Sequence, residues 1–266
     1  MSLPMSPDPI RPVTPWHDGV AQWQVVDMLT PGECAQWLAV IDALRPHWVR
    51  RGPPTLSAYT LGAATYLDAQ PLALYQQMAA QLNPVLQQHF ADLYQMLELV
   101  LAPHVGPVAP AHGLALPGFH VYGEPEGQQM SPASCQFMEQ PVGSIHVDMP
   151  YRSHQAYWAQ FAQVDFVDTL TFTLCLRAPL HGAGLNVWGQ MQFDEGHPPQ
   201  QMPRGRFDPA ALGPAVRYPY REGGLHFFRG HLVHQMAPGV QLSGQDRRVT
   251  LQGHAVRADG IWRMFF

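Results

Sequence analysis

Residues 143–150 read Gly-Ser-Ile-His-Val-Asp-Met-Pro, and the rest of the chain can be organised around this stretch. Its centre, Ser144–Asp148, has the composition of a β-strand. Side chains on a strand alternate between its two faces, so His146 and Asp148 point to the same side. An imidazole and a carboxylate presented together form half of a metal site, and the missing ligand would be a histidine far along the chain.

Three histidines late in the chain are candidates for that ligand. Residues 223–238 read Gly-Gly-Leu-His-Phe-Phe-Arg-Gly-His-Leu-Val-His-Gln-Met-Ala-Pro. His234 is favoured, because it lies within a short predicted strand, Leu232–Met236. His231, beside the preceding turn, is the main alternative, and His226 belongs to the strand before it. Two histidines and one carboxylate with open coordination positions are the ligand set of non-heme Fe(II) oxygenases.

A second pair of residues predicts a carboxylate-binding site. Arg248 and Thr250 share one face of a predicted strand. A guanidinium binds a carboxylate through two parallel hydrogen bonds, and a neighbouring hydroxyl adds a third. The pair would hold the far carboxylate of a dicarboxylic co-substrate whose other end chelates the metal. Arg247 is the alternative, but it would face the opposite side of the strand.

The chain after about Gly118 has the alternating pattern of β-strands, with turn-forming Gly, Pro, Asp and Asn between the segments. Eight successive strands without an intervening helical pattern indicate a jelly roll, or double-stranded β-helix. The eight predicted strands are Phe119–Tyr122, Ser144–Asp148, Leu170–Leu176, Leu185–Trp188, Val216–Tyr220, Leu225–Phe228, Leu232–Met236 and Arg248–Val256.

The segment before these strands favours helices. Thr30, with Pro31 after it and Glu33 three positions later, is a capping box that predicts a helix over residues 31–44. A second helical pattern covers residues 71–101, and Asn83-Pro84 should divide it into two helices. Short strands are expected at residues 20–28 and 61–67. The helices should pack against one face of the sheet.

The domain organisation follows from this pattern. Residues 1–19 carry five prolines and predict an extended lead. Residues 20–266 should form a single domain, with a helical flank over 20–117 and a β-helix core over 118–266, because the flank has no core of its own. Two insertions interrupt that core. Residues 149–168 are rich in aromatic side chains and predict either a substrate lid or a helix packed on the barrel. Residues 190–214 predict an exposed loop.

Composition narrows the possible partners. The chain has 266 residues, of which 46% are hydrophobic and 13% charged, as in folded proteins. A net charge of -5 argues against general affinity for nucleic acid or for anionic membranes. The three cysteines form no paired motif, so a reducing, cytoplasmic location is expected. No apolar run is long enough for a transmembrane helix. The oligomeric state cannot be inferred from the sequence.

The ordered set His146-x-Asp148, His234 and Arg248-x-Thr250, placed on eight candidate strands, resembles the Fe(II)/2-oxoglutarate-dependent oxygenases. The resemblance covers roughly residues 20–256. In that family the His-x-Asp pair lies at the second core strand, the distal histidine on the seventh, and the arginine at the start of the eighth. The predicted strands put these residues in the same places.

The resemblance implies the chemistry. His146, Asp148 and His234 would be the iron ligands, and Arg248 with Thr250 would bind the C5 carboxylate of 2-oxoglutarate. A further candidate for that carboxylate is Tyr122. The reaction would use O2 and 2-oxoglutarate, release succinate and CO2, and hydroxylate or otherwise oxidise an unactivated C–H bond. Because a carboxylate is present at position 148, the halogenase type of site, which has a small residue there, is not expected.

Other interpretations remain open. The chain could be a cupin-like metal enzyme that does not use 2-oxoglutarate, or a jelly-roll binding module without metal. A small molecule, such as a secondary metabolite, is the expected substrate, and a protein or peptide residue is the alternative. Several further residues could line the pocket or belong only to the folded core: Thr171, Thr173, Asn186 and His254.

Overall fold

The computed structural model describes residues 23–141, 143–191 and 212–266. The proline-rich lead over residues 1–19 lies outside the described residues, as does most of the insertion over residues 190–214. Within the described part of the chain, no helix has the length and apolar character needed to cross a membrane.

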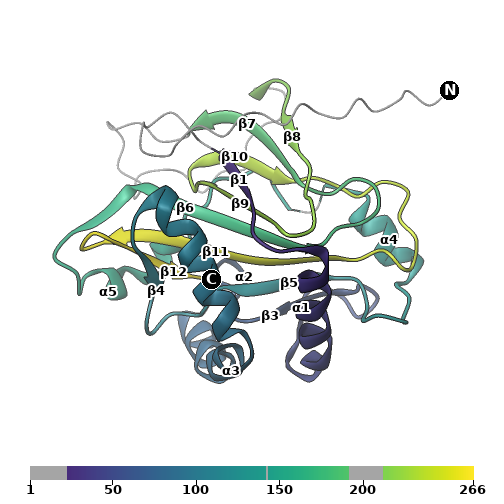
Figure 1. Cartoon of the computed structure of the whole chain (residues 1–266), viewed down its shortest axis with the longest axis horizontal. Helices are drawn as coiled ribbons and strands as arrows, with labels where there is room; N and C mark the ends of the chain where they lie inside the picture. The colour runs from purple at the N-terminus through teal and green to yellow at the C-terminus, as the bar shows by residue number, and fades with distance from the viewer. Residues whose placement is uncertain (1–22, 142, 192–211) are drawn as a thin grey trace.

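Two β-sheets face each other. The larger one has the strand order β1-β9-β6-β11-β5-β3-β2, and β12 extends it by pairing with β11 and with β4. The smaller one has the order β10-β7-β8 and lies across the larger sheet at the top of Figure 1. The strands of the larger sheet are β1 (Trp23–Asp27), β2 (Val49–Arg50), β3 (Ala58–Leu61), β4 (Val108–Pro110), β5 (Gly118–Tyr122), β6 (Val164–Arg177), β9 (Gly224–Arg229), β11 (Arg248–Ala258) and β12 (Ile261–Phe265). Those of the smaller sheet are β7 (Leu185–Met191), β8 (Val216–Tyr218) and β10 (Leu232–Met236).

The predicted strands correspond to observed strands with one exception. Seven of the eight are present as β5 to β11, with ends within three residues of those expected, except that β6 begins six residues earlier, at Val164 and not Leu170. Ser144–Asp148 is not a regular strand, because its pairing partner changes along its length. His146 pairs with His234 as an isolated antiparallel bridge, whereas the backbone N–H of Asp148 donates to the carbonyl of Gly230, outside β10. Short strands β2, β4 and β12 were not predicted.

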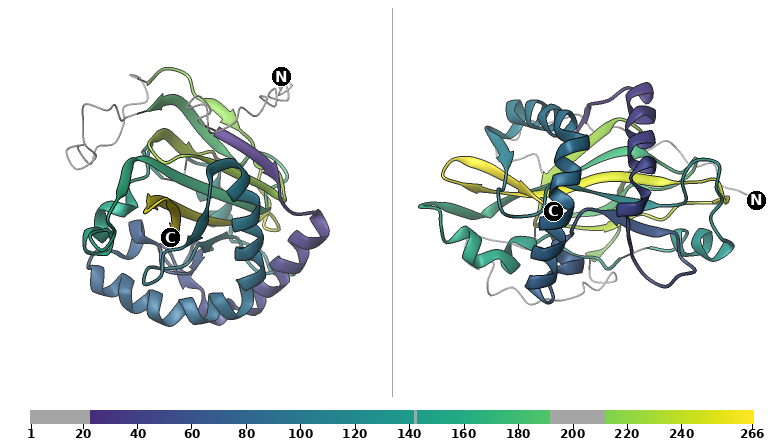
Figure 2. Two further views of the ribbon diagram at one scale, coloured as in Figure 1. Left: turned by 60° about the vertical axis from the view of Figure 1, so that its left-hand side comes forward. Right: turned by 90° about the horizontal axis from the view of Figure 1, so that it is seen from below.

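Two helices cover the outer face of the larger sheet, as expected (Figures 1 and 2). They are α1 (Pro31–Ala43) and α3 (Leu72–Val105). The apolar stripe of α3 follows the helical period, and its members at Leu86, Phe90, Leu93 and Leu97 are all fully buried. They belong to one hydrophobic cluster with sheet residues such as Leu251. The helical flank and the β-strands therefore share a core, to which each buried Leu or Phe contributes roughly 1.5–3 kcal/mol.

The prediction of two helices divided at Asn83-Pro84 is wrong. α3 continues through Pro84, and its backbone leaves helical geometry at Phe90 instead (φ −127°, ψ 15°). Proline removes the hydrogen bond to the carbonyl of Ala80. Ala80 and Pro84 are both exposed, so water can satisfy that carbonyl. Asn83 does not end the helix either, because its side chain bonds to the backbone of Leu114 and Leu116.

Three other segments refine the expectations for the flank and the insertion. The strand expected over residues 61–67 is misplaced, since β3 ends at Leu61 and the short helix α2 (Thr65–Asp68) follows. A further helix that was not predicted, α4, covers Pro132–Met138. The insertion after Asp148 forms a 3₁₀ turn over Pro150–His154 and the short helix α5 (Gln155–Trp158).

Candidate metal centre

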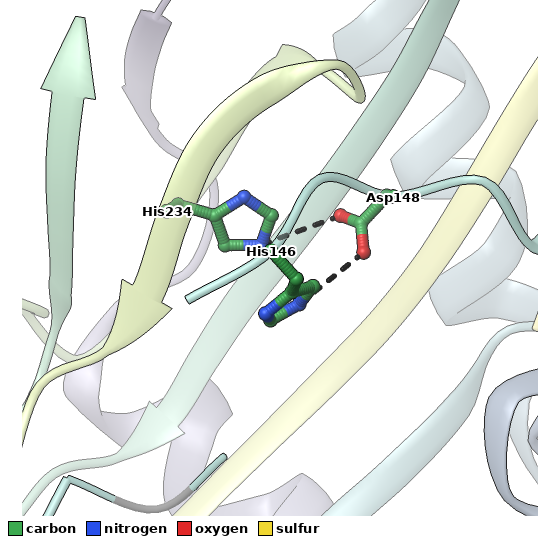
Figure 3. A group of neighbouring side chains, drawn as sticks. All are labelled: His146, Asp148 and His234. Atoms are coloured by element: carbon green, nitrogen blue, oxygen red, sulfur yellow. Dashed lines mark ion pairs between the residues drawn. The ribbon is translucent and has the colours of Figure 1, made fainter. Parts of the chain in front are cut away.

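His146, Asp148 and His234 lie together between the two sheets (Figure 3). Each offers one ligand atom, and these atoms all lie within 4.8 Å of one another. Nε2 of His146 is 3.6 Å from Oδ1 of Asp148, and Nε2 of His234 is 3.4 Å from Oδ2. Asp148 and His234 are buried, whereas the side chain of His146 is 42% exposed. One side of the cluster is therefore open to a ligand.

Backbone hydrogen bonds between distant parts of the chain position the two histidines. The N–H of His146 donates to the carbonyl of His234 at 3.0 Å, and the N–H of His234 returns a bond to His146 at 2.9 Å. This reciprocal pair sets the two imidazoles next to each other, with ring centroids 4.4 Å apart. The 87 residues between them (147–233) include β6 to β9 and the turn that brings β10 back.

The tautomers of both imidazoles follow from their neighbours. Nδ1 of His146 lies 2.6 Å from the carbonyl of Ser144, and Nδ1 of His234 lies 2.8 Å from that of Leu232. A carbonyl can only accept, so each Nδ1 carries the proton. In the neutral form of each imidazole, Nε2 is then the nitrogen with the free lone pair, and on both residues it faces Asp148, as metal ligation requires.

The charges of the cluster also suit a cation. Burial lowers the pKa of His234 to about 4, so its imidazole is neutral at pH 7. For Asp148, burial acts to raise the pKa, but His234, His254 and His146 together with the Thr171 hydrogen bond outweigh it, and the pKa lies below its usual value. An ionised carboxylate and a neutral imidazole bind a divalent metal without first releasing protons. The donor set of two nitrogens and one oxygen fits a non-heme Fe(II) ion.

A cavity of about 690 Å³ adjoins the three residues. Arg248, Thr250 and Tyr122, the residues expected to bind a carboxylate, all line it. The β11–β5 register places Arg248 opposite Tyr122. The guanidinium of Arg248 lies 5.0 Å from the ring centre of Tyr220, and its buried Nε has no hydrogen-bond partner among the described residues. A buried donor without a partner is costly, so a ligand accepting from it would stabilise the site.

The structure separates these residues from their alternatives. Arg247 points away from the cavity and forms a two-bond ion pair with Asp42, at 3.0 and 2.6 Å. His231 is fully buried, and its Nε2 lies 3.0 Å from the hydroxyl of Tyr151. His226 is also buried, with its ring 4.9 Å from that of Tyr220. Neither histidine belongs to the cluster that His146, Asp148 and His234 form.

The site contains polar residues that the sequence did not single out. Tyr66 and His120 line the cavity and are hydrogen-bonded to each other, as the phenol hydroxyl meets Nε2 of the imidazole. Tyr66 was missed because α2 was expected to be a strand, and His120 carried no motif. Arg51 also lines the cavity, where Asp68 binds its guanidinium at 2.6 and 2.8 Å.

The residues whose role the sequence left open are now placed. Thr173 lines the cavity, whereas Asn186 does not. Thr171 and His254 lie beside Asp148: the hydroxyl of Thr171 donates to Oδ2 at 2.8 Å, and Nδ1 of His254 lies 3.9 Å from the same oxygen. Both are buried.

The aromatic insertion is mainly a packed structure. Tyr151 and Trp158 are each only 2% exposed, and Trp158 packs against Phe265 of β12 with ring centroids 5.5 Å apart. The beginning of the insertion nevertheless forms part of the cavity wall, through Met149, Pro150, Arg152 and Ser153. Of the two interpretations, the packed aromatic helix describes the second half, and the first half contributes to the cavity.

Comparison with known proteins identifies the fold. No protein-family model matches the sequence, and no curated protein sequence matches it. Among solved structures, one similar protein is a novel N-substituted L-amino acid dioxygenase from Burkholderia ambifaria AMMD, with 15% identity over 94% of this chain and 88% of that one, at a TM-score of 0.56. The same enzyme in complex with alpha-ketoglutarate (2-oxoglutarate) matches with 16% identity over the same shares, at 0.53. The predicted double-stranded β-helix with a helical flank is thereby confirmed.

Proposed function

We propose that this chain is an Fe(II)- and 2-oxoglutarate-dependent dioxygenase that hydroxylates, or otherwise oxidises, a C–H bond of a small molecule. The observation that carries the proposal is one juxtaposition: a cavity whose wall contains His146, Asp148 and His234 also contains a buried arginine, Arg248, beside a threonine hydroxyl. The shared fold with an amino acid dioxygenase that binds alpha-ketoglutarate supports it.

Each group in the cavity has a place in this proposal. His146, Asp148 and His234 would hold the iron, since their tautomers and charges suit a divalent cation. Arg248 and Thr250 would bind the far carboxylate of 2-oxoglutarate and so direct its keto-acid end toward the metal. With O2, the bound iron and 2-oxoglutarate supply the oxidising power and yield succinate and CO2. The chain's own contribution is to orient the substrate and limit access of water.

A small-molecule substrate suits the size and lining of the cavity. Its volume of about 690 Å³ lies within the range typical of sites for small ligands. Tyr66, Leu67 and Met149 give it apolar surface, and His120 and Gln70 add polar groups. This combination favours a molecule with an apolar body and a few hydrogen-bonding groups.

The test is a turnover assay on the purified protein, loaded with Fe(II) under anaerobic conditions and then exposed to O2. We expect succinate release that requires both iron and 2-oxoglutarate and that a screened metabolite stimulates. Asp148→Ala and His234→Ala should abolish it, whereas a matched control at an exposed histidine, His89→Ala, should not change it.

A cupin-like metal enzyme without a keto-acid co-substrate is the alternative. It predicts metal binding by the same three residues, but no binding of 2-oxoglutarate to the metal-loaded protein and no effect of Arg248 substitutions. Metal binding with turnover that is independent of 2-oxoglutarate would overturn the dioxygenase proposal in favour of this alternative.

A further inference from the structure

A buried hydrogen-bond chain reaches Asp148 from behind. Thr171 on β6 and His254 on β11 are direct cross-strand partners in the larger sheet. The hydroxyl of Thr171 donates to Oδ2 of Asp148 at 2.8 Å and lies 3.1 Å from Nδ1 of His254. Their exposures are 1% for Thr171, 3% for His254 and 8% for Asp148, so water does not compete for these bonds.

The donor and acceptor roles in this series of hydrogen bonds follow from the protons that each group can supply. An ionised carboxylate can only accept, so Thr171 must give its single hydroxyl proton to Asp148. Toward His254 the hydroxyl oxygen can then only accept, which places the imidazole proton on Nδ1. Nε2 of His254 is consequently the bare nitrogen, and it is a buried atom without a hydrogen-bond partner among the described residues. Hydrogen bonds aligned in this way strengthen one another.

The two carboxylate oxygens of Asp148 are therefore not equivalent. Oδ2 accepts from Thr171 and also lies 3.4 Å from Nε2 of His234, whereas Oδ1 receives no hydrogen bond from the described residues and lies 3.6 Å from Nε2 of His146. Both oxygens therefore face the histidines, and Oδ2 keeps a second lone pair beside the Thr171 bond. The carboxylate cannot rotate about its own axis without breaking that bond, which fixes its orientation toward the two imidazoles.

We propose that Thr171 and His254 are positioning residues that hold the carboxylate of Asp148 in the orientation needed to ligate a metal. This inference rests on the proposed function. Without the Thr171 bond the carboxylate could turn away from the two imidazoles that complete the candidate metal centre. Thr171, which His254 orients, would keep it facing them without touching metal or substrate.

The test is titration of the metal-free protein with Co(II) under anaerobic conditions, because the visible absorption of bound Co(II) reports its coordination number. Thr171→Val keeps the side-chain volume and removes the hydroxyl. We expect it to weaken Co(II) affinity about 10-fold or more and to change the absorption spectrum of the bound Co(II), because the carboxylate is no longer held in one orientation. Thr171→Ser, which retains the hydroxyl, should restore the wild-type affinity and spectrum.

The chain provides a matched control for this substitution. Thr169 lies on the same face of β6, two residues away, is 3% exposed, and has a hydroxyl without a hydrogen-bond partner in the described part of the chain. Thr169→Val should leave Co(II) affinity and spectrum unchanged. His254→Leu should reproduce a smaller part of the Thr171→Val effect. His254→Asn should behave as the wild type does, because the amide N–H of asparagine can take the place of Nδ1.

The outcomes separate this inference from the proposed function. If Thr171→Val binds Co(II) with the same affinity and spectrum as Thr169→Val, the positioning role is wrong while the dioxygenase proposal stands. If wild-type protein binds no metal, both are wrong. Thermal unfolding of each metal-free variant distinguishes loss of the fold from loss of the site. Should Thr171→Val fail to fold, the comparison of His254→Leu with His254→Asn decides the question in the same way.

Discussion

Two consecutive arginines of the chain have opposite roles because a strand alternates its side chains. Arg247 faces outward and binds Asp42 of α1, which ties the flank to the sheet. Arg248 faces the cavity, and its exposure is 7%. Burying a charged group costs free energy, so a buried cation is normally paired with an anion or binds a ligand. A cation–π contact with the ring of Tyr220 offsets part of the free-energy cost of burying the Arg248 guanidinium.

Replacing Arg248 should weaken binding of 2-oxoglutarate and leave metal binding intact. Hydrogen bonds to charged groups contribute about 1.5–3 kcal/mol each, so Arg248→Gln should raise the Kd of 2-oxoglutarate roughly 10- to 100-fold. Arg248→Lys should recover only part of this, because lysine cannot form the two-bond contact. Calorimetric titration of 2-oxoglutarate into the Co(II)-loaded protein measures the Kd of each variant.

The matched control for Arg248 lies on the same strand. The side chain of Arg257 on β11 is 49% exposed and lies outside the cavity. Arg257→Gln should therefore bind 2-oxoglutarate as the wild type does. Equal affinities for Arg248→Gln and Arg257→Gln would remove Arg248 from the co-substrate site.

At the scale of residues, the sequence predicts those contacts that depend on the spacing between residues close together in the chain. Spacing of two places Arg248 with Thr250 on one face of β11, because the strand period fixes the face. The same spacing brings His146 and Asp148 together, although their stretch is only an isolated bridge in the structure. The contact of Thr171 with His254 depends instead on the β6–β11 register, which no local pattern contains. Tyr66 and His120 meet across 54 residues for the same reason.

At the scale of elements, Asn83 shows how one side chain joins a helix to a loop. Its Nδ2 donates to the carbonyl of Leu114 at 2.8 Å, and its Oδ1 accepts from the N–H of Leu116 at 3.0 Å. Leu114 is buried and Leu116 nearly so, hence neither backbone group has easy access to water. This loop leads directly into β5, which carries His120 and Tyr122.

Asn83→Asp should destabilise the protein by about 2 kcal/mol, because a carboxylate keeps the acceptor for Leu116 but cannot donate to Leu114. Urea unfolding at pH 7.5 measures the change. α3 offers no exposed asparagine for a matched control. Gln88→Glu, at an exposed position of the same helix, serves instead. Equal unfolding free energies for the two variants would show that the loop is not held by Asn83.

The start of α1 depends on a cap that the sequence predicts correctly. Thr30 Oγ1 accepts from the N–H of Glu33 at 3.3 Å, and the carboxylate of Glu33 accepts from the N–H of Thr30 at 2.7 Å. Thr30→Ala should lower the free energy of unfolding by about 1 kcal/mol. Thr55→Ala, at an exposed loop position, should change it much less. Urea unfolding midpoints of the two variants that coincide would contradict the role of the cap.

The ends of helices and strands are predicted well where a local sequence signal also determines the observed structure. The capping box fixes the first residue of α1, since its donors and acceptors lie within one turn. The proline signal at residue 84 is equally local but is overruled, because the stripe of buried side chains along α3 continues past it and the lost hydrogen bond faces solvent. The stretch Ser144–Asp148 fails as a strand for a third reason: its pairing partner changes from His234 in β10 to Gly230, which lies before β10 begins.

At the scale of the whole molecule, the packing of two sheets and a helical layer buries many imidazoles. Outside the candidate metal centre, burial lowers the pKa of His226 to about 3 and that of His154 and His231 to about 4. For His120 burial, with Arg248 and Arg51 nearby, lowers the pKa to about 3. These four histidines come from different elements, so together they report on the integrity of the whole fold.

Because the pKa values of these buried histidines are lowered, acid destabilises the folded protein. In the unfolded chain a histidine has a pKa near 6.5, so between pH 6.5 and about 4 the unfolded state binds more protons than the folded state. Stability is therefore complete above pH 6.5 and is lost as the pH falls. Each such histidine contributes about 1.4 kcal/mol of this loss between pH 7.5 and 5.5.

Urea unfolding of the metal-free protein at pH 7.5 and 5.5 should therefore show a loss of several kcal/mol. The contribution of a single histidine to this loss of stability can be measured at His226, because neither of its ring nitrogens has a hydrogen-bond partner in the described structure. In His226→Leu the loss between the two pH values should be smaller than in the wild type by about 1.4 kcal/mol, whatever the variant's stability at pH 7.5. His89→Gln, at an exposed position of α3, should leave the difference unchanged. An unaltered pH dependence in His226→Leu would mean that His226 is protonated or solvated in the folded protein, and that the interior around β9 is open to water.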